Sequence, residues 1–266
     1  MCLLLTMRMR TGFLILLVAT MVVGYSHVAK ADMVFFGEDI NWTATGDNEN
    51  AVRIPHPNSD AAQANFFAFL RGAGTETFEG FEANSIVNSI DFGPDTATLT
   101  RGLSALNQPS GTFNGVYPIS GDQTLLQSIS TSDILHLEFS SPQAAFGFYM
   151  TDVEIVGNLS LRFFLVDGVS TIDRVVPTQA GANGANNTGS VAYFGVIDTT
   201  NLFSGVSFVR TLNSNDGFGF DDMTIGRAAM VVPEPTYGVF WLTGLLAVMN
   251  QRRRSESLSS KIKSCL

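Results

Sequence analysis

Apolar and polar residues alternate with a period of two over much of the second half of the chain. The segments with this pattern are 134–139, 146–150, 159–165, 191–197, 206–209 and 218–225. In the first of them, Leu135, Leu137 and Phe139 share one face, which is typical of a strand with one buried side. Short turn-like stretches such as Asp167-Gly168 separate the segments, and strands joined by short turns run antiparallel. We therefore predict a mostly β fold, an antiparallel β-sandwich of jelly-roll type with about six to nine strands.

One or two short helices complete the predicted fold. A helical run covers 61–70, with Asn58, Ser59 or Asp60 as its N-cap and Gly72 just beyond its end. A second short helix is expected over 83–90. The Gly- and Asn-rich stretch 179–189 predicts a flexible loop.

Charge divides the chain into three parts. Residues 32–232 hold 22 acidic residues, seven arginines and no lysine, a net charge of −15, whereas 1–31 and 233–266 carry +3 each. This balance excludes a basic nucleic-acid binder, and an apolar content of 45% excludes a disordered acidic tail. The two cysteines, Cys2 and Cys265, lie at opposite ends of the chain, which excludes a disulfide scaffold.

The first 31 residues have the organisation of a signal peptide. Arg8 and Arg10 precede an apolar run over 11–25, which has the length of a signal-peptide core and is short for a membrane span. Ala29 and Ala31 form the small-x-small pattern that signal peptidase requires, so we predict cleavage after Ala31. An uncleaved anchor helix is the alternative.

A second apolar run, over 237–249, lies near the other end of the chain. Arg252, Arg253 and Arg254 follow it. The stretch 231–250 is long enough to cross a bilayer at about 1.5 Å per residue. Arginine-rich flanks stay in the cytoplasm, so we predict a transmembrane segment with both basic ends inside and the acidic body exported. A buried core helix is the alternative for this run.

The C-terminal motif resembles a known sorting signal. Pro233-Glu234-Pro235, the apolar segment and the three arginines follow one another as in the PEP-CTERM protein-sorting domain, over roughly residues 231–254. The resemblance implies a bacterial exported protein that is processed by signal peptidase and by a membrane-embedded exosortase. It implies a location at the cell surface or in the extracellular matrix, with transient anchoring in the membrane. The chain then has four parts: a signal peptide over 1–31, an exported β-sandwich over 32–230, a sorting signal over 231–254 and a polar cytoplasmic tail over 255–266.

The region between the two ends of the chain also resembles other PEP-CTERM exported proteins. The stretches 77–81, 146–152 and 216–226 resemble strands of other PEP-CTERM exported proteins. The last of them also resembles the closing strand of carbohydrate-binding jelly rolls. The candidate partner of the body is extracellular polysaccharide.

Four aspartates form the candidate metal site. The apolar face switches between Phe220 and Met223, which predicts a β-bulge that re-aims a carboxylate. Adjacent carboxylates repel unless a cation lies among them, and Ca²⁺ prefers carboxylate and carbonyl oxygens. The predicted ligands of a structural Ca²⁺ ion are Asp152, Asp216, Asp221 and Asp222. An exposed acidic turn, or pairing with Arg210 or Arg227, is the alternative.

Catalytic residues are not assigned. Glu79 with Glu82, and Asp152 with Glu154, are pairs of the kind that glycoside hydrolysis needs, but such pairs arise by chance among 22 acidic residues. His56 and His136 have no nucleophile motif nearby, and His136 is expected to point away from the core. The chain is therefore predicted not to be an enzyme, with no cofactor beyond Ca²⁺.

Two aromatic residues are candidates for stacking on sugar rings. They are Trp42 and Tyr149, and packing within the fold is the alternative for both. The leading hypothesis is a non-enzymatic exported protein of the cell surface or matrix that is sorted by an exosortase-type system and binds glycan. The alternatives are a secreted polysaccharide-active enzyme and an unprocessed tail-anchored surface protein.

Overall fold

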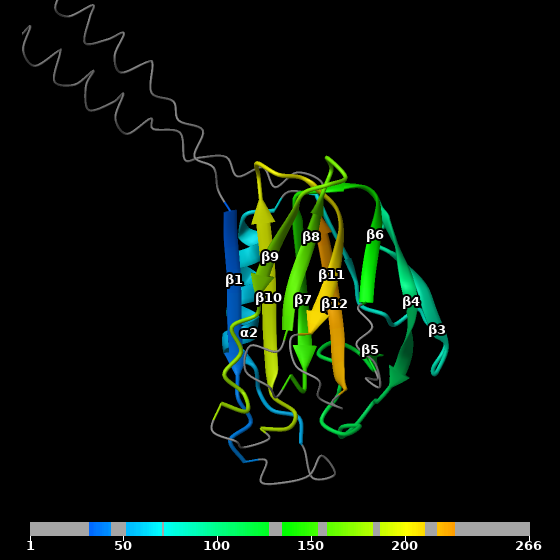
Figure 1. The fold of residues 1–266 in the computed structure, drawn as a ribbon. Helices are drawn as coiled ribbons and strands as arrows, with labels where there is room; N and C mark the ends of the chain where they lie inside the picture. The colour runs from blue at the N-terminus through cyan, green and yellow to red at the C-terminus, as the bar shows by residue number, and fades with distance from the viewer. Residues whose placement is uncertain are drawn as a thin grey trace, which may run out of the picture. The chain divides into compact units, whose positions relative to one another are not determined.

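The fold is seen in a computed structural model, which describes residues 32–43, 52–70, 72–127, 135–153, 159–182, 187–210 and 217–226. Twelve strands and one helix lie in this described part of the chain (Figure 1). In chain order they are β1 (Asp32–Asp39), α2 (Pro57–Ala68), β2 (Ala73–Glu76), β3 (Ile86–Asp91), β4 (Thr96–Asn107), β5 (Gln123–Gln127), β6 (Leu135–Gln143), β7 (Ala145–Thr151), β8 (Leu159–Leu165), β9 (Thr171–Val175), β10 (Val191–Asp198), β11 (Phe203–Arg210) and β12 (Phe218–Gly226).

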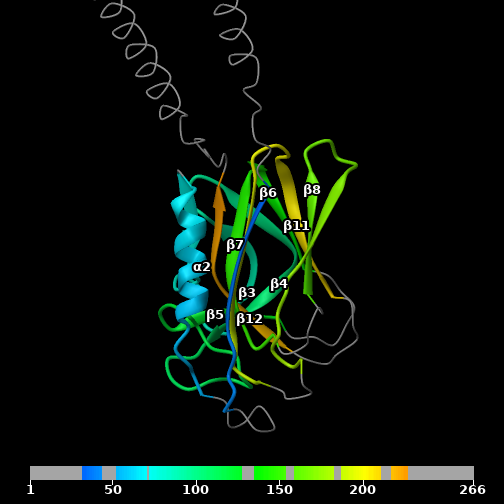
Figure 2. The ribbon, with the colours of Figure 1, turned by 90° about the vertical axis from the view of Figure 1, so that its left-hand side faces the viewer.

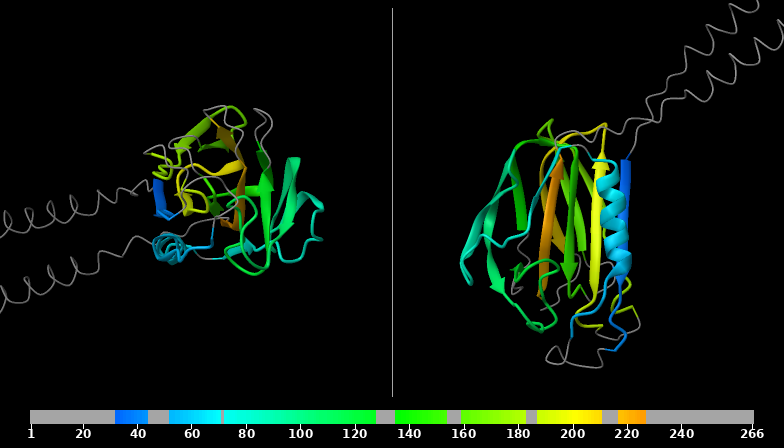
Figure 3. Two further views of the ribbon diagram at one scale, coloured as in Figure 1. Left: turned by 90° about the horizontal axis from the view of Figure 1, so that it is seen from below. Right: turned by 180° about the vertical axis from the view of Figure 1, so that it is seen from behind.

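All the strands belong to one antiparallel sheet. Its order is β1-β10-β7-β12-β5-β4-β6-β11-β8-β9, while β2 pairs with β12 and β3 pairs with β4. The sheet curls, so that its two halves face each other across a common core (Figure 3). Phe148 of β7 and Phe208 of β11, which belong to opposite halves, have ring centroids 5.0 Å apart. The predicted mostly β, antiparallel sandwich is confirmed, and its jelly-roll type stays a prediction.

The six strands predicted from alternation are all present. They are β6, β7, β8, β10, β11 and β12, and β8 covers the predicted range 159–165. In β6 the buried residues Leu135, Leu137 and Phe139 alternate with more exposed ones, which confirms the predicted hydrophobic face.

The second predicted helix, over 83–90, is wrong. Residues of this range form the strand β3, in which Val87 and Ile90 are buried. Ile86 to Asp91 pair with β4, and β-branched residues favour such a pleated surface over a helix. Tertiary pairing therefore overrides the local helical pattern.

The predicted helix over 61–70 is present as α2, but its N-cap is not one of the predicted residues. Asp39, at the end of β1, accepts backbone N–H groups from Asn58 (3.2 Å) and Ser59 (2.9 Å) and the Ser59 hydroxyl (2.8 Å). The capping carboxylate thus comes from a strand about 20 residues earlier in the chain.

Helix α2 covers the outer surface of β1, β10 and β7 (Figure 2). Phe66 is fully buried there and packs above the glycine pair Gly147 and Gly195, which are opposite each other in β7 and β10. This side of the sheet is therefore closed by the helix. No helix in the described part of the chain is long and apolar enough to span a membrane, and both predicted apolar runs lie outside that part.

The stretch 179–189, predicted as a flexible loop, forms no helix or strand in its described residues. These residues are nevertheless packed. Ala180, Asn187 and Thr188 are buried, and the Asn187 side chain donates a hydrogen bond to the Asn41 carbonyl. The described ends of the loop are thus fixed by burial and hydrogen bonds.

Candidate functional site

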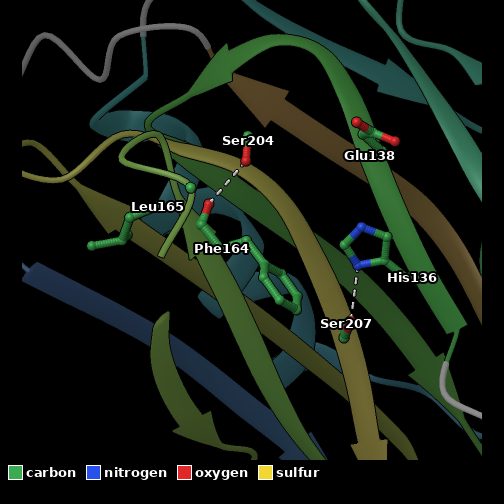
Figure 4. A pocket seen from close by; sticks show the side chains of 7 residues that line it. His136, Glu138, Phe164, Leu165, Ser204 and Ser207 are labelled. Atoms are coloured by element: carbon green, nitrogen blue, oxygen red, sulfur yellow. Dashed lines mark hydrogen bonds between the residues drawn. The ribbon is translucent and has the colours of Figure 1, made fainter. Parts of the chain in front are cut away.

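The candidate site is a pocket on the outer surface of strands β6, β11 and β8 (Figure 4). We call this surface the outer face. It consists of the side chains that alternate with the buried core residues in β4, β6, β11, β8 and β9. In the strand order of the sheet, β6, β11 and β8 lie at the other end from β1, β10 and β7, which α2 covers. The pocket is an open depression of about 390 Å³. It is lined by His136, Glu138, Phe164, Leu165, Gly168, Ser204 and Ser207.

The strand register explains why a hollow forms at this point. Gly205 of β11 lies between Glu138 of β6 and Phe164 of β8 in the ladder. A Cβ atom on Gly205 would lie 2.6 Å from the Leu137 carbonyl oxygen and 3.0 Å from Cε1 of His136. Only glycine therefore fits here without a shift of its neighbours. A register shift between Phe203 and Gly205 bends the strand beside this position.

His136 is held in one orientation by two neighbours. Its Nδ1 forms a hydrogen bond of 2.9 Å with the Ser207 hydroxyl, and its ring meets Phe164 edge to face with centroids 4.9 Å apart. Burial lowers the pKa of His136, and the nearby Glu138 carboxylate opposes this effect more weakly. This shift favours the neutral imidazole, which offers hydrogen bonds without a positive charge.

The rim of the pocket carries one carboxylate. Glu138 is exposed, and no hydrogen bond or ion pair to its carboxylate is found among the described residues. In the adjacent row of the same face, Arg162 donates from Nε and Nη2 to the two oxygens of Asp173, each at 2.8 Å. The arginine is thereby engaged in a bidentate pair.

The predicted β-bulge at the acidic pair is confirmed. The pairing of β12 with β7 shifts register between Asp221 and Thr224, and Asp222 has a φ of 46°. The buried Asp221 carboxylate accepts backbone N–H groups from Ile119 (2.7 Å), Ser120 (3.1 Å) and Asp222 (2.8 Å). Burial and the adjacent Asp222 raise the pKa of Asp221 well above its ordinary value.

The predicted Ca²⁺ site is not tested as a whole, because Asp216 lies outside the described residues. Asp152 is buried and accepts the Gly189 N–H at 2.8 Å, and Asp222 accepts the Ser120 hydroxyl at 2.7 Å. Among the residues that the structure describes, no group of three or more metal-binding side chains gathers. The four-aspartate site stays a prediction.

In the predicted pair of Glu79 and Glu82, the Glu79 carboxylate has a structural role. Oε1 of Glu79 accepts the N–H groups of Asp122 (2.9 Å) and Gln123 (2.8 Å), which fixes the segment before β5. Glu82 is exposed. Glu154, from the other predicted pair, lies outside the described residues.

The two candidate aromatic residues have different environments. Trp42 is 65% exposed and lies in the turn that follows β1. Tyr149 is buried, and its hydroxyl donates to Asp60 at 2.8 Å, so packing is the correct interpretation for this residue. His56 bonds Asp60 at the start of α2, away from any pocket residue.

The predicted processing residues Ala29, Ala31, Pro233, Glu234, Pro235, Arg252, Arg253 and Arg254 also lie outside the described residues. Sequence reasoning placed His136 on the outer face, which is confirmed, but did not find the pocket around it. The only sequence signal for the pocket is that polar residues alternate with core residues in β6 and β11. Which of these polar residues lie side by side depends on the cross-strand register at Gly205, and alternation within one strand does not give that register.

No protein-family model and no curated protein matches this chain. Several solved structures are similar to part of it. A cleaved adhesin domain of Lys-gingipain has 11% identity and a TM-score of 0.39, over 58% of this chain and 97% of that one. A mutant of the family 29 carbohydrate-binding module CBM29-2 has 10% identity and a TM-score of 0.33, over 62% and 99%. A xylan-binding domain of family 22 has 13% identity and a TM-score of 0.28, over 59% and 96%. These likenesses concern the β-sandwich fold alone.

Proposed function

We propose that the chain is an exported surface protein whose β-sandwich binds polysaccharide at the outer-face pocket. The observation that carries the proposal is the composition of this one open depression. It combines the aromatic ring of Phe164, the imidazole of His136 and the carboxylate of Glu138, which has no partner among the described side chains. A sugar ring needs apolar area for its C–H face and a few directed polar groups for its hydroxyls, and this pocket offers both.

The surroundings of the pocket suit a chain-like ligand. Thr96, Thr98 and Thr100 are exposed on β4, and Thr171 and Asp173 are exposed on β9. The outer face therefore presents polar groups on both sides of the pocket. A polysaccharide that crosses the strands meets hydrogen-bonding side chains over several sugar units.

Binding fits the geometry better than hydrolysis does. His136 and Ser207 are within hydrogen-bond distance, as a general base and a nucleophile are, but Ser207 lies inside a paired strand. An activated serine also needs a base that a third group orients. Among the described residues, no carboxylate bonds the second ring nitrogen of His136. We therefore propose binding rather than catalysis at this pocket, and the secreted enzyme becomes an outcome of the test below.

Export and sorting are supported by the two ends of the sequence. The signal-peptide pattern, the Pro233-Glu234-Pro235 motif and the final arginines flank a body with a net charge of −15. We expect mass spectrometry of the surface protein to find Asp32 as the first residue and a C-terminus near this motif. A mature protein that keeps all residues through Leu266 contradicts exosortase processing.

Glycan binding is tested with the protein on an array of polysaccharides and oligosaccharides, followed by titration of those that bind. Phe164→Ala removes the aromatic surface, so we expect affinity to fall about tenfold or more. The matched control is Trp42→Ala, which removes an exposed aromatic residue that does not line the pocket and leaves affinity within about twofold. Loss of binding in the Trp42 variant alone, or turnover of the glycan, contradicts the proposal.

A further inference from the structure

The charge at the pocket is dominated by one group. Glu138 lines the depression, and its carboxylate has no cationic or hydrogen-bonding partner among the described residues. A ligand in the pocket is therefore placed beside a negative charge that no described side chain neutralises.

One arginine of the outer face, Arg162, is already paired with a carboxylate. Arg162 follows Ser207 in the row of side chains that begins at His136. Both oxygens of Asp173 engage its guanidinium group at 2.8 Å. An anionic sugar at this position therefore meets an ion pair in which Asp173 already balances the arginine's charge.

The imidazole in the pocket does not supply a cation either. Its ring lies edge to face on Phe164 and is bonded to Ser207, and this partly buried position favours the neutral form. The body as a whole adds to the negative charge at Glu138, because residues 32–232 have a net charge of −15. Both the local and the general field therefore repel anions.

We propose that the pocket takes neutral or amino-bearing sugars and rejects uronic acids, with Glu138 as the residue that sets this selectivity. The inference rests on the proposed function and deepens it. Sugar hydroxyls or an ammonium group donate hydrogen bonds to the Glu138 carboxylate, whereas a sugar carboxylate in the same position would face a like charge.

The test uses the purified full chain and glycans matched in length and linkage but different in charge. For each of several backbones the set contains the neutral, the amino and the uronate form, for example oligomers of glucose, glucosamine and glucuronic acid. At low salt we expect the uronate form to bind about tenfold or more weakly than the neutral form. Raising the salt concentration to about 1 M reduces this difference, because it screens exposed charges.

Two substitutions separate the effect of the Glu138 charge from the effect of the protein's overall net charge. Glu138→Gln keeps the size of the side chain, and we expect it to reduce the difference between neutral and uronate forms to about threefold or less. Glu82→Gln removes the same charge from an exposed residue that does not line the pocket, and should leave the difference unchanged.

The outcomes distinguish the two proposals. If no neutral or amino glycan binds, the proposed function is wrong. If glycans bind but the uronate forms bind as well as or better than the neutral ones, the function stands and the charge selectivity is wrong. Equal effects of the two glutamine variants also contradict the role of Glu138.

Discussion

At the scale of single residues, the carboxylates of this acidic body accept backbone N–H groups. Asp39 bonds the first turn of α2, Glu79 bonds the segment before β5, and Asp221 bonds the neighbouring stretch at Ile119 and Ser120. Such charge-assisted bonds satisfy turn and helix-end donors that would otherwise be left without partners. Acidic residues that the sequence offered as metal or catalytic candidates thus have structural partners within the fold.

The cap formed by Asp39 gives the first prediction. Asp39→Ala leaves the N–H groups of Asn58 and Ser59 without an acceptor at a partly buried site, so we expect the free energy of unfolding to fall by about 1–3 kcal/mol. Urea denaturation measures this change. The control, Glu82→Ala, removes an exposed acid and should alter stability by less than about 0.5 kcal/mol. Equal stability of the two variants contradicts the capping role.

At the scale of elements, the contact between α2 and the sheet depends on glycine. Gly147 and Gly195 leave space for the Phe66 ring, and a Cβ atom on Gly195 would lie 2.7 Å from Cδ2 of that ring. The helix therefore lies against the strands through a contact that larger residues cannot make.

Gly195→Ala accordingly forces Phe66 or the helix to move, and we expect it to lower the free energy of unfolding by about 1–3 kcal/mol. Gly80→Ala is the matched control, since a Cβ atom there meets nothing within 4 Å. Thermal and chemical denaturation compare the two. A Gly195 variant as stable as the Gly80 variant would show that α2 does not pack as described.

The strands differ in how well the sequence predicts them. Strands with one buried face, such as β6 and β8, were predicted because alternation marks them directly. The local pattern over 83–90 predicts a helix, whereas residues 86–91 form β3, because the strand depends on pairing with β4. The pocket was not foreseen for a similar reason: Glu138, Gly205 and Phe164 belong to three strands, and only the register brings them together.

At the scale of the whole molecule, burial and net charge act together on stability. Burial raises the pKa values of Glu38, Glu76, Asp221 and Asp222. For these groups the folded protein binds protons more tightly than the unfolded chain does. Their contribution to stability is thus fully present below the unfolded pKa and is lost as pH rises through the raised values. Asp167 and Asp173, whose pKa values are lowered by hydrogen bonds, add stability that is lost only at lower pH.

We therefore expect the free energy of unfolding to fall as the pH rises from 5 to 8. Added salt should reduce this fall, because it screens the repulsion among the acidic residues of 32–232, whose net charge is −15. His136 acts in the opposite sense, because its lowered pKa adds stability as pH rises. Asp221→Asn isolates the buried carboxyl, and its unfolding free energy should depend less on pH. Denaturation at several pH values measures both proteins. An increase in wild-type stability towards pH 8 contradicts this prediction.

The central proposal is that the outer-face pocket binds a neutral or amino-bearing glycan. Titration of the isotope-labelled protein with a glycan that binds on the array, followed by NMR, tests it most directly. The account predicts that the largest chemical-shift changes lie at His136, Glu138, Phe164, Ser204 and Ser207. Changes that gather instead around Trp42 or along α2, with the pocket residues unaffected, would contradict it.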